Sequence, residues 1–335
     1  MSIIQKIGVI GAGAWGTALA ITARRAGRDV VIQAHEADVA KTINQAHENS
    51  FFLPGVPLDK GIWATTDLSK IAACDAVFLA MPAQFLRAVT GEMAAFWRTE
   101  VPAVICAKGI EQTTGSLLSE IATQTLPGVN LAALSGPTFA IEVAKGLPTA
   151  VTLASKDVNT LVALSKAIST PTFRAYRSND IIGVELGGAI KNVLAIGCGI
   201  IEGRKLGDNA RAAFITRGLA EIARMATAKG ADPGTMLGLS GLGDLSLTCN
   251  AMQSRNFSLG VALGEGQVLG DILAKRSSIA EGVFTASSAV QLAKTLNVEM
   301  PLCSAMDSIL NKNGDIDKTI QNLLARPVGD EEPLG

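Results

Sequence analysis

The sequence is short of the features that mark secreted, metal-binding and nucleic-acid-binding proteins. Its 335 residues include five cysteines, scattered singly, with no C-x-x-C pair and no metal-ligand spacing. The formal net charge is −1, and there is no long run of Lys or Arg. We therefore expect reduced thiols, no metal site, and neither a nucleic acid nor an anionic membrane surface as a partner.

Leader and membrane-spanning signals are also missing. The N-terminus has no basic start followed by an apolar core and a small-residue cleavage site. The longest apolar stretches are interrupted by charges or glycines well short of a membrane span. These absences predict a cytoplasmic protein that is not embedded in a membrane.

Small and apolar residues, by contrast, are abundant. Apolar residues make up 48% of the chain and aromatic residues only 4%, and there are 34 glycines. This balance is typical of an α/β protein built from parallel strands, crossover helices and tight turns. Because 335 residues exceed the size at which single cores usually stop growing, we expect two domains.

The spacing of apolar residues changes along the chain. In the first part, short β-branched runs alternate with amphipathic stretches, which indicates βαβ units. The strands are expected at Lys6 to Ile10, Asp29 to Gln33, Ala76 to Met81, Ala103 to Cys106 and Leu131 to Leu134, with two more at the far edge of the sheet, Thr149 to Ala154 and Thr172 to Tyr176. The helices between them are expected at Ala14 to Ala26, Glu36 to His47, Ala83 to Phe96 and Gly115 to Thr125.

From Asp180 onward the strand signal ends and helical patterns take over. Helices are expected at Asp180 to Arg204, Ala210 to Lys229, Phe257 to Leu263, Val283 to Leu296, Met306 to Leu310 and Ile316 to Leu324. We therefore predict an α/β domain over residues 1–185, followed by a mostly α-helical domain over residues 186–335.

A glycine-rich turn, Gly11-Ala12-Gly13-Ala14-Trp15-Gly16, joins the first expected strand to the first expected helix. Gly11 permits a tight turn, Gly13 lets the backbone approach a pyrophosphate, and Gly16 lets the helix pack closely on the strand. The helix N-terminus then offers N–H groups and a partial positive charge to phosphates. This context favours a Rossmann-like dinucleotide-binding domain over a glycine turn without a ligand.

The end of the second expected strand leaves the choice between NAD and NADP open. An acid that binds the ribose is expected about 20 residues past the glycine turn. Glu36 stands one or two places late, whereas His35 could approach a 2′-phosphate or could be an ordinary loop histidine. We expect NADP or dual use, without excluding NAD.

Histidine and tyrosine are scarce, and this excludes two common proton donors for carbonyl reduction. The two histidines, His35 and His47, both lie in the first half of the chain. The single tyrosine, Tyr176, has Asp180 rather than a lysine four positions on. Proton transfer must therefore fall to Lys, Asp, Glu or Cys.

Lys191 is the best candidate for that proton transfer. Gly187 and Gly188 precede it by four and three residues, so one helix face presents an ammonium beside bare backbone where a small substrate could lie. A lysine partly desolvated in such a cleft has a lowered pKa and can act as acid and base near neutrality. The alternative is a solvent-facing lysine on a helix that packs through its glycines.

Two polar groups follow neighbouring expected strands. Lys108 emerges where open α/β sheets bind ligands, at the carboxyl end of a strand. Gly136-Pro137-Thr138 occupies the same place after the next strand and is expected to begin a helix. These residues would offer an ammonium, backbone N–H groups and a hydroxyl.

Two more polar groups lie in the second part. Asp244 stands in a glycine-rich turn, Gly241 to Leu245. Gln253-Ser254-Arg255-Asn256 places donors just before a helical run, which is what a phosphate needs. The alternative for this group is a simple helix N-cap by Ser254 or Asn256.

These segments together resemble the NAD(P)-dependent glycerol-3-phosphate dehydrogenases of the bacterial type. They occur in the family's order and cover both expected domains, so they are far more specific than the glycine turn. The matching segments are GAGAWGTALA (Gly11 to Ala20), AKGIE (Ala107 to Glu111), LSGPTFAIEVAKGLPTA (Leu134 to Ala150), IGVELGGAIKNVLAIGCGI (Ile182 to Ile200), NARAAFITRGLAE (Asn209 to Glu221), GLGDLSLTC (Gly241 to Cys249), QSRN (Gln253 to Asn256) and AEG (Ala280 to Gly282).

The resemblance implies reversible hydride transfer between dihydroxyacetone phosphate and sn-glycerol 3-phosphate with NAD(P)H, in the supply of glycerophospholipids, by a homodimer. It implies that Lys191 is the proton acceptor, acting as an acid in the reducing direction, that Asp244 orients the lysine or a substrate hydroxyl, and that Lys108 is a further catalytic residue. The implied substrate-binding residues are Lys108, Gly136, Thr138, Lys191, Asp244, Ser254, Arg255 and Asn256. The cofactor-binding residues are Gly11, Gly13, Ala14, Trp15, Gly16, His35, Lys108, Ala140, Arg255, Ile279 and Glu281.

The sequence departs from the family at two places. Many relatives carry a Trp and an Arg where this chain has Gln33-Ala34-His35-Glu36, which bears on cofactor preference. Phe257 follows Asn256 where relatives often have a basic residue, which bears on the charge near the phosphate. Two rival interpretations are a related dehydrogenase for a hydroxy acid or opine, and a nucleotide-binding redox sensor without turnover. The donors at Ser254 to Asn256 favour a phosphate substrate over a hydroxy acid or opine.

Overall fold

The computed structural model describes residues 3–276 and 280–328. The chain divides into two compact units, which are described separately. The first unit comprises Met1–Ala107 and Leu118–Ile181, and the second comprises Lys108–Leu117 and Ile182–Gly335. The short segment after residue 107 thus belongs with the second unit although it lies within the first part of the sequence.

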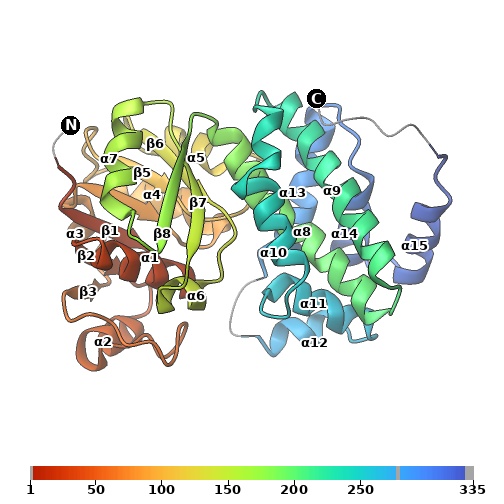
Figure 1. Cartoon of the computed structure of the whole chain (residues 1–335), viewed down its shortest axis with the longest axis horizontal. Helices are drawn as coiled ribbons and strands as arrows, with labels where there is room; N and C mark the ends of the chain where they lie inside the picture. The colour runs from red at the N-terminus through yellow and green to blue at the C-terminus, as the bar shows by residue number, and fades with distance from the viewer. Residues whose placement is uncertain (1–2, 277–279, 329–335) are drawn as a thin grey trace. The chain divides into compact units, whose positions relative to one another are not determined.

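The first unit is built on one eight-stranded sheet (Figure 1). The strand order is β3-β2-β1-β4-β5-β6-β7-β8. Strands β1 to β6 are parallel, β7 runs antiparallel to β6, and β8 is parallel to β7. The strands are β1 (Lys6–Ile10), β2 (Asp29–Gln33), β3 (Ile62–Thr65), β4 (Ala76–Leu79), β5 (Pro102–Ile105), β6 (Asn130–Ser135), β7 (Thr149–Ala154) and β8 (Phe173–Ser178). The first six follow the order 3-2-1-4-5-6 of a doubly wound dinucleotide-binding sheet, which confirms the predicted Rossmann-like α/β class.

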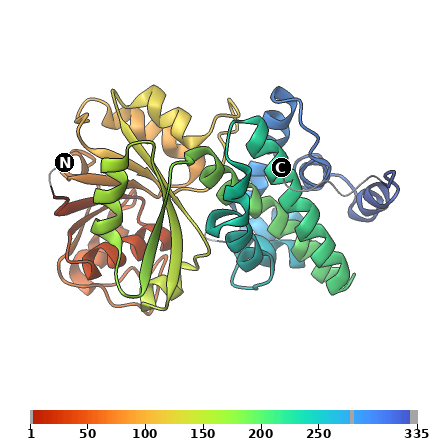
Figure 2. The same cartoon turned by 45° about the horizontal axis from the view of Figure 1, so that its top comes forward.

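Most expected strands are present within one or two residues, and β7 and β8 lie at the edge of the sheet as predicted. The edge strand β3 was not predicted, because only two of its four residues, Ile62 and Ala64, are buried. By contrast, β4 and β5 are buried along their whole length, as strands covered on both faces must be. In Figures 1 and 2, β7 and β8 cross the view steeply relative to β1, which is the twist expected of a wide sheet.

Short and medium helices connect these strands. They are α1 (Ala14–Arg25), α2 (Ala37–Ala46), α3 (Ser69–Ala72), η1 (Ala83–Phe85), α4 (Leu86–Met93), α5 (Leu118–Thr125), α6 (Ala140–Lys145) and α7 (Val158–Ile168). A helix was expected to begin at Gly136 to Thr138, and α6 begins at Ala140 instead. Helix α7 was not predicted, although its N-terminus carries a cap, since the Asp157 carboxylate accepts from the N–H groups of Asn159 and Thr160. The expected helix over residues 83–96 is instead a 3₁₀ turn followed by the shorter α4.

From Ile182 onward, the regular elements of the second unit are all helices among its described residues, whereas Lys108–Leu117 contains only an isolated β-bridge between Ile110 and Leu117. Its helices are α8 (Ile181–Gly203), α9 (Asp208–Ala228), η2 (Pro233–Leu237), η3 (Leu239–Gly243), α10 (Asp244–Cys249), α11 (Arg255–Gly264), α12 (Leu269–Ala274), α13 (Glu281–Thr295), α14 (Pro301–Asn311) and α15 (Ile316–Leu324). The six helices expected here are present, whereas the short α10 and α12 were not predicted. This confirms a mostly helical second part.

Helix α8 is the central helix of the second unit's core. It is long and apolar enough to cross a membrane by length and composition, with a mean hydropathy of 1.5. Charges and glycines interrupt its apolar run, as expected from the sequence, but they do not bring its mean hydropathy below that of a membrane span. However, 94% of the 18-residue apolar stretch within this helix is buried inside the protein, as expected of a core helix surrounded by other helices.

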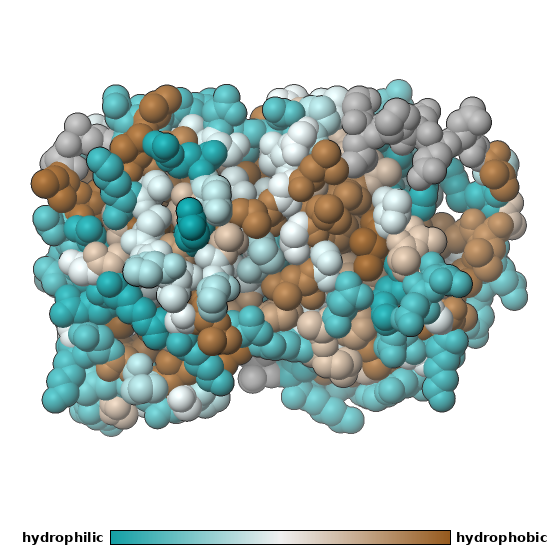
Figure 3. All heavy atoms as spheres, in the orientation of Figure 1, coloured by the Kyte–Doolittle hydropathy of each residue, from teal (hydrophilic) through white to brown (hydrophobic). Residues whose placement is uncertain are grey.

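Helix α15 contributes least to this core. None of its residues is fully buried, and Leu324 is 81% exposed. Figure 3 shows apolar atoms at the surface in the region of α15, mixed with hydrophilic ones. The stability of the second unit therefore rests mainly on the helices that surround α8.

Helices α8 and α11 cross at a contact made by glycines. A Cβ atom added at Gly260 would lie 2.0 Å from the Ile196 oxygen, and one added at Gly199 would lie 2.1 Å from the Phe257 oxygen. Gly203 and Gly264 extend the same contact one turn further. No real Cβ fits at such distances, so glycine at these positions sets the close spacing of the two helices.

Gly260→Ala should therefore lower the free energy of unfolding by about 3 kcal/mol, because the methyl group must push two backbones apart. Gly270 in α12 is the matched control, since a Cβ there meets nothing within 4 Å. Gly270→Ala should be neutral or stabilise by about 0.5–1 kcal/mol. Denaturant unfolding of both variants checks this, and equal effects would contradict the packing argument.

Candidate active site

The glycine turn has the geometry that each of its glycines predicts. Gly11 has φ +102°, and a Cβ there would lie 2.6 Å from the Met81 nitrogen. A Cβ at Gly16 would lie 1.9 Å from the Gly11 oxygen, so the start of α1 packs directly on the turn. A Cβ at Gly13 would meet nothing within 4 Å, which leaves open space beside the backbone. The turn can thus receive a ligand at Gly13.

The N-terminus of α1 is arranged for an anion. Its N-cap residue is Gly13, which supplies no side-chain oxygen to the first-turn N–H groups, and no acidic residue lies in that turn. The Trp15 indole N–H donates to the Cys106 oxygen, 3.2 Å away, which holds Trp15 toward the end of β5. The backbone at Ala14 and Trp15 therefore fits the pyrophosphate of a dinucleotide.

His35 and Glu36 follow β2 and are both exposed. Glu36 is the N-cap of α2 but makes no side-chain capping bond. Both side chains are therefore accessible at the carboxyl edge of the sheet, where a ribose or 2′-phosphate would lie. Their positions leave both dinucleotides open, as the sequence does.

The segment after β6 differs from the expectation. The helix begins at Ala140, not at Gly136 to Thr138, and the Thr138 hydroxyl donates to the Gly136 oxygen at 3.1 Å. Gly136 has φ +151°, and a Cβ there would lie 2.9 Å from the Val151 Cα. Glycine is therefore required at this position by the close approach of β7.

A buried ionic cluster lies in the second unit. Lys191 is 5% exposed and Asp244 is fully buried. The Lys191 ammonium donates to Asp244 Oδ1 and to the Thr248 hydroxyl, which is 2.8 Å away. Lys108 Nζ donates to the other carboxylate oxygen, Asp244 Oδ2, at 2.7 Å. One carboxylate thus holds two ammonium groups.

Burial lowers the pKa of Lys191 to about 7. The negative charge of Asp244 opposes this shift, and the positive charge of Lys108 adds to it. At neutral pH, Lys191 is therefore present in both the ammonium and the amine form. Such a group can give up and take back a proton without a large energetic cost.

Local backbone structure places Asp244 in this cluster. The expected glycine-rich turn is a single π-helical turn, η3, and Asp244 follows it as the first residue of α10. A Cβ at Gly187 would lie 2.5 Å from the Ser240 oxygen in η3. The bare backbone at Gly187 is therefore covered by protein, and its glycine serves helix packing.

The residues from Ser254 to Asn256 lie at the start of α11. Ser254 is its N-cap and accepts from the Phe257 N–H at 3.2 Å, so the N-cap alternative is correct for this side chain. Asn256 donates to Asn192 Oδ1 at 2.9 Å and accepts from the Gly282 N–H at 3.2 Å. Asn256 thus links α11 to the residue after Lys191 and to the start of α13.

Arg255 is exposed at this helix start. Partial desolvation lowers the pKa of its guanidinium, and the nearby Glu281 carboxylate opposes that shift. Glu281 begins α13. Ile279, the other family position in this segment, lies outside the described residues.

Four polar residues near these groups were not assigned roles from the sequence: Asn49, Asn192, Thr248 and Arg276. Thr248 and Asp244 are four residues apart and share one helix face, so the spacing alone could have paired them. Arg276 donates to the Arg255 oxygen at 2.6 Å and to the Ser258 hydroxyl at 3.2 Å. It places a second guanidinium at the start of α11.

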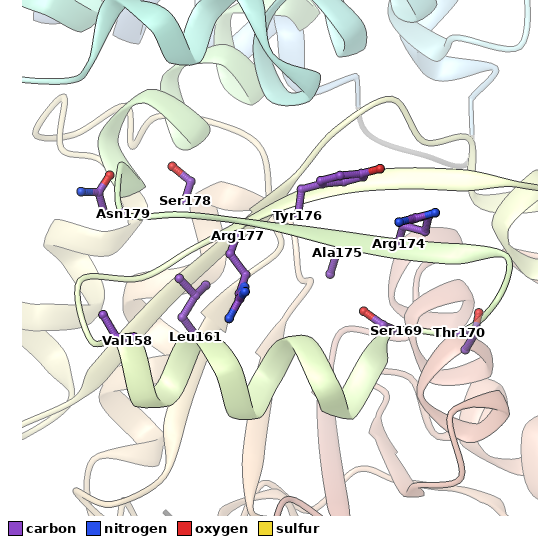
Figure 4. Close-up of a pocket in the computed structure, with 10 residues that line it drawn as sticks. All are labelled: Val158, Leu161, Ser169, Thr170, Arg174, Ala175, Tyr176, Arg177, Ser178 and Asn179. Atoms are coloured by element: carbon purple, nitrogen blue, oxygen red, sulfur yellow. The ribbon is translucent and has the colours of Figure 1, made fainter.

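A shallow pocket elsewhere in the first unit contains none of these residues. It lies between α7 and β8, as Figure 4 shows. Arg177 points from β8 toward α7, and the Arg174 guanidinium stacks over the Tyr176 ring, 5.6 Å from its centroid. The pocket holds no acid–base pair, so we assign it no chemistry.

Cysteines and metal ligands add nothing further to the site. All five cysteines are free thiols, and all five are buried. Among residues 3–276 and 280–328, no group of three His, Cys, Asp or Glu side chains could hold a metal ion.

A parallel sheet with this glycine turn, and a buried lysine and carboxylate on a helical unit, are typical of a dinucleotide-dependent dehydrogenase. Comparison with known families makes the class specific. Residues 6–161 match the family described as NAD-dependent glycerol-3-phosphate dehydrogenase N-terminus, and residues 180–321 match the corresponding C-terminus. The chain belongs to the family of NAD-dependent glycerol-3-phosphate dehydrogenases.

Similar proteins agree over nearly the whole chain. A glycerol-3-phosphate dehydrogenase [NAD(P)+] of Rhodospirillum rubrum is 56% identical over 327 residues, which cover 97% of this chain and 94% of that protein. The enzyme of the same name from Parvibaculum lavamentivorans is 52% identical, with 98% of each covered. The crystal structure of glycerol-3-phosphate dehydrogenase from Coxiella burnetii has a TM-score of 0.93 at 37% identity and covers 96% of this chain and 99% of that one.

Proposed function

We propose that this chain interconverts dihydroxyacetone phosphate and sn-glycerol 3-phosphate with NAD(P)H. The observation that carries the proposal is the buried Lys191, which has a pKa of about 7 and is held by Asp244 and Thr248. Family membership supports the substrate, and Lys191 is one of the residue types that can transfer the proton where the second unit has no histidine.

Residues 1–185 would hold the dinucleotide and residues 186–335 most of the substrate. When bound, the nicotinamide supplies the hydride that adds to the substrate carbonyl carbon. Gly11, Gly13 and Gly16 shape the turn, and the N–H groups at Ala14 and Trp15 would bind the pyrophosphate. His35, Ala140, Ile279 and Glu281 complete the proposed cofactor contacts. We expect NADP or dual use, without excluding NAD, since His35 is exposed and could approach a 2′-phosphate, and Glu36 stands one or two places past the usual ribose-binding position.

The phosphate of the substrate would lie at the start of α11. Arg255 and the α11 N-terminus supply positive charge there, and Ser254, Asn256, Lys108, Gly136 and Thr138 are the further proposed contacts. A guanidinium and backbone N–H groups match phosphate oxygens in geometry and charge. Fixing the phosphate in this way would limit the positions that the carbonyl can take.

Lys191 would transfer the proton. In reduction, the ammonium gives its proton to the carbonyl oxygen as the hydride arrives at carbon, and the product is the secondary alcohol. In oxidation, the neutral amine takes the hydroxyl proton. Asp244 and Thr248 orient the amine. The charges of Asp244 and Lys108 shift the pKa of Lys191 in opposite directions.

A substrate panel tests the proposal. NADH and NADPH oxidation is followed at 340 nm with dihydroxyacetone phosphate, unphosphorylated dihydroxyacetone, and a 2-oxo acid. We expect turnover with dihydroxyacetone phosphate, and a kcat/KM lower by a factor of a hundred or more for the other two. Equal or higher kcat/KM with the 2-oxo acid would contradict the proposal and favour a hydroxy-acid dehydrogenase.

Arg276 should add to phosphate binding through its charge. Arg276→Ala should raise the KM for dihydroxyacetone phosphate several-fold and make it less dependent on salt, with kcat nearly unchanged. Its neighbour Lys275 is the matched control, because it is exposed and removal of its charge changes the net charge equally. Equal effects of Arg276→Ala and Lys275→Ala would assign the change to the overall charge of the protein.

We also propose a cytoplasmic homodimer that serves glycerophospholipid synthesis, as the family resemblance implies. Light scattering should then give about twice the chain mass of 34.6 kDa. A mass of one chain at micromolar concentration would contradict the dimer.

A further inference from the structure

Asn49 is a fully buried polar residue that no part of the proposed mechanism uses. It lies between α2 and β3, with 0% of its surface exposed. Its side-chain N–H groups donate to the Ala12 oxygen at 2.7 Å and to the Thr17 hydroxyl at 2.8 Å. Its side-chain oxygen accepts from the Phe52 N–H at 3.2 Å. Both donor contacts are to the glycine turn or the first turn of α1.

The bond to Ala12 fixes one peptide plane of the turn. The Ala12 oxygen points at Asn49, and in a trans peptide the following N–H, that of Gly13, points the opposite way. Gly13 is the residue beside which the space is open. Asn49 therefore keeps the Gly13 N–H directed away from the core and available to a ligand.

Asn49 is itself held rigidly. Its backbone oxygen accepts from the Leu53 N–H at 2.9 Å. The Leu58 N–H donates to the His47 oxygen at 2.8 Å, and this bond joins the two ends of the segment that contains Asn49. Leu53 and Leu58 are buried in the core of the first unit. A side chain fixed in this way holds the turn in its binding conformation before a ligand arrives, which lowers the entropic cost of binding.

Asparagine is the residue type that this position requires. The contacts with Ala12 and Thr17 need a side-chain donor, and the Phe52 N–H needs a side-chain acceptor. Asparagine carries both on one amide group, at the same distance from its backbone. Aspartate would keep the acceptor but place oxygen against the Ala12 oxygen. Alanine would remove all three bonds.

We infer that Asn49 is a positioning residue for the dinucleotide pyrophosphate, acting through the Ala12–Gly13 peptide. The inference rests on the proposed function for the identity of the ligand. Its consequence is specific, because the loss of Asn49 should weaken the binding of the dinucleotide and leave proton transfer unchanged.

The test compares Asn49→Ala and Asn49→Asp with Asn44→Ala. Asn44 is the matched control, since it also ties two segments of the same unit through paired bonds with Ala64, at 2.8 and 2.9 Å, but does not touch the turn. The dissociation constants of NADPH and ADP-ribose are measured by calorimetry, kcat is measured at saturating NADPH, and Tm is measured without ligand.

We expect both Asn49 variants to bind NADPH and ADP-ribose about tenfold more weakly, with kcat within twofold of the parent, and Asn49→Asp to bind them more weakly than Asn49→Ala. Asn44→Ala should lower Tm without changing either dissociation constant. If Asn49→Ala lowers Tm but binds both ligands as tightly as the parent, the inference is wrong.

Thr17→Val tests the same contact if the Asn49 variants do not fold. It removes the second partner of Asn49 and should weaken dinucleotide binding two- to threefold, and unchanged binding would overturn the inference. The outcome is separable from that of the proposed function. Weaker ADP-ribose binding without any turnover of dihydroxyacetone phosphate by the parent enzyme would refute the substrate and support the role of Asn49.

Discussion

Lys191→Met should lower kcat for the reduction of dihydroxyacetone phosphate by about 10² to 10⁴, the usual contribution of a positioned acid or base. Methionine fills a similar volume in this buried site, but its side chain has no group that can give up or accept a proton. Binding of NADPH should change less than twofold, because the glycine turn and α1 are intact. Steady-state kinetics at 340 nm and calorimetry with NADPH measure the two effects.

A second lysine variant controls for the loss of positive charge in the second unit. Lys294 lies exposed on α13, and Lys294→Met should retain nearly full activity. If Lys191→Met keeps kcat within threefold of the parent, another group transfers the proton.

Asp244→Asn should damage both stability and catalysis. The substitution leaves Lys191 and Lys108 beside a neutral amide, and breaking a buried ion pair in this way costs about 3–5 kcal/mol. It should also lower the pKa of Lys191 below 7. In the parent protein the negative charge of Asp244 opposes the effect of burial, and the substitution removes that charge. At neutral pH less ammonium would be present, so the reduction should slow more than the oxidation.

A double variant separates charge repulsion from misfolding. Lys108→Met in the Asp244→Asn background removes one of the two ammonium groups and should recover part of the lost stability. Urea unfolding of the four combinations gives the coupling energy. No recovery, or an Asp244→Asn variant as stable as the parent, would contradict the account of the cluster.

The sequence predicted the central strands well because they are continuous apolar runs between turn residues. Strands β1, β2 and β7 have the expected bounds. Strand β3 was missed because it is an edge strand with one buried face, and its exposed Trp63 breaks the apolar run. The π-helical turn η3 was also missed. It depends on Gly241 meeting the Met236 backbone, and such a contact leaves no periodic pattern in the sequence.

The candidate site was predicted to a similar degree. Lys191, Asp244 and Lys108 were singled out separately, and the structure brings them together. Composition could exclude histidine chemistry, but it could not show that Asp244 faces both lysines. The sequence predicted a substrate beside Gly187, whereas the backbone of Ser240 lies there. A glycine that makes room for a ligand and one that makes room for a neighbouring backbone look alike in sequence. Asn49 and Arg276 carry no motif, and their bonds to Ala12 and Arg255 arise only from the fold.

The pH dependence of kcat/KM in both directions tests the role of Lys191 most directly. The pKa of Lys191 is about 7. For reduction, which needs the ammonium, kcat/KM should be level below that pH and fall about tenfold per unit above it. For oxidation, which needs the amine, it should rise to the same pH and then level off. Ionisation of the substrate phosphate persists in Lys191→Met, so only the inflection due to the lysine should vanish there. A reduction profile that stays level to pH 9, or an inflection unchanged in Lys191→Met, would contradict the account.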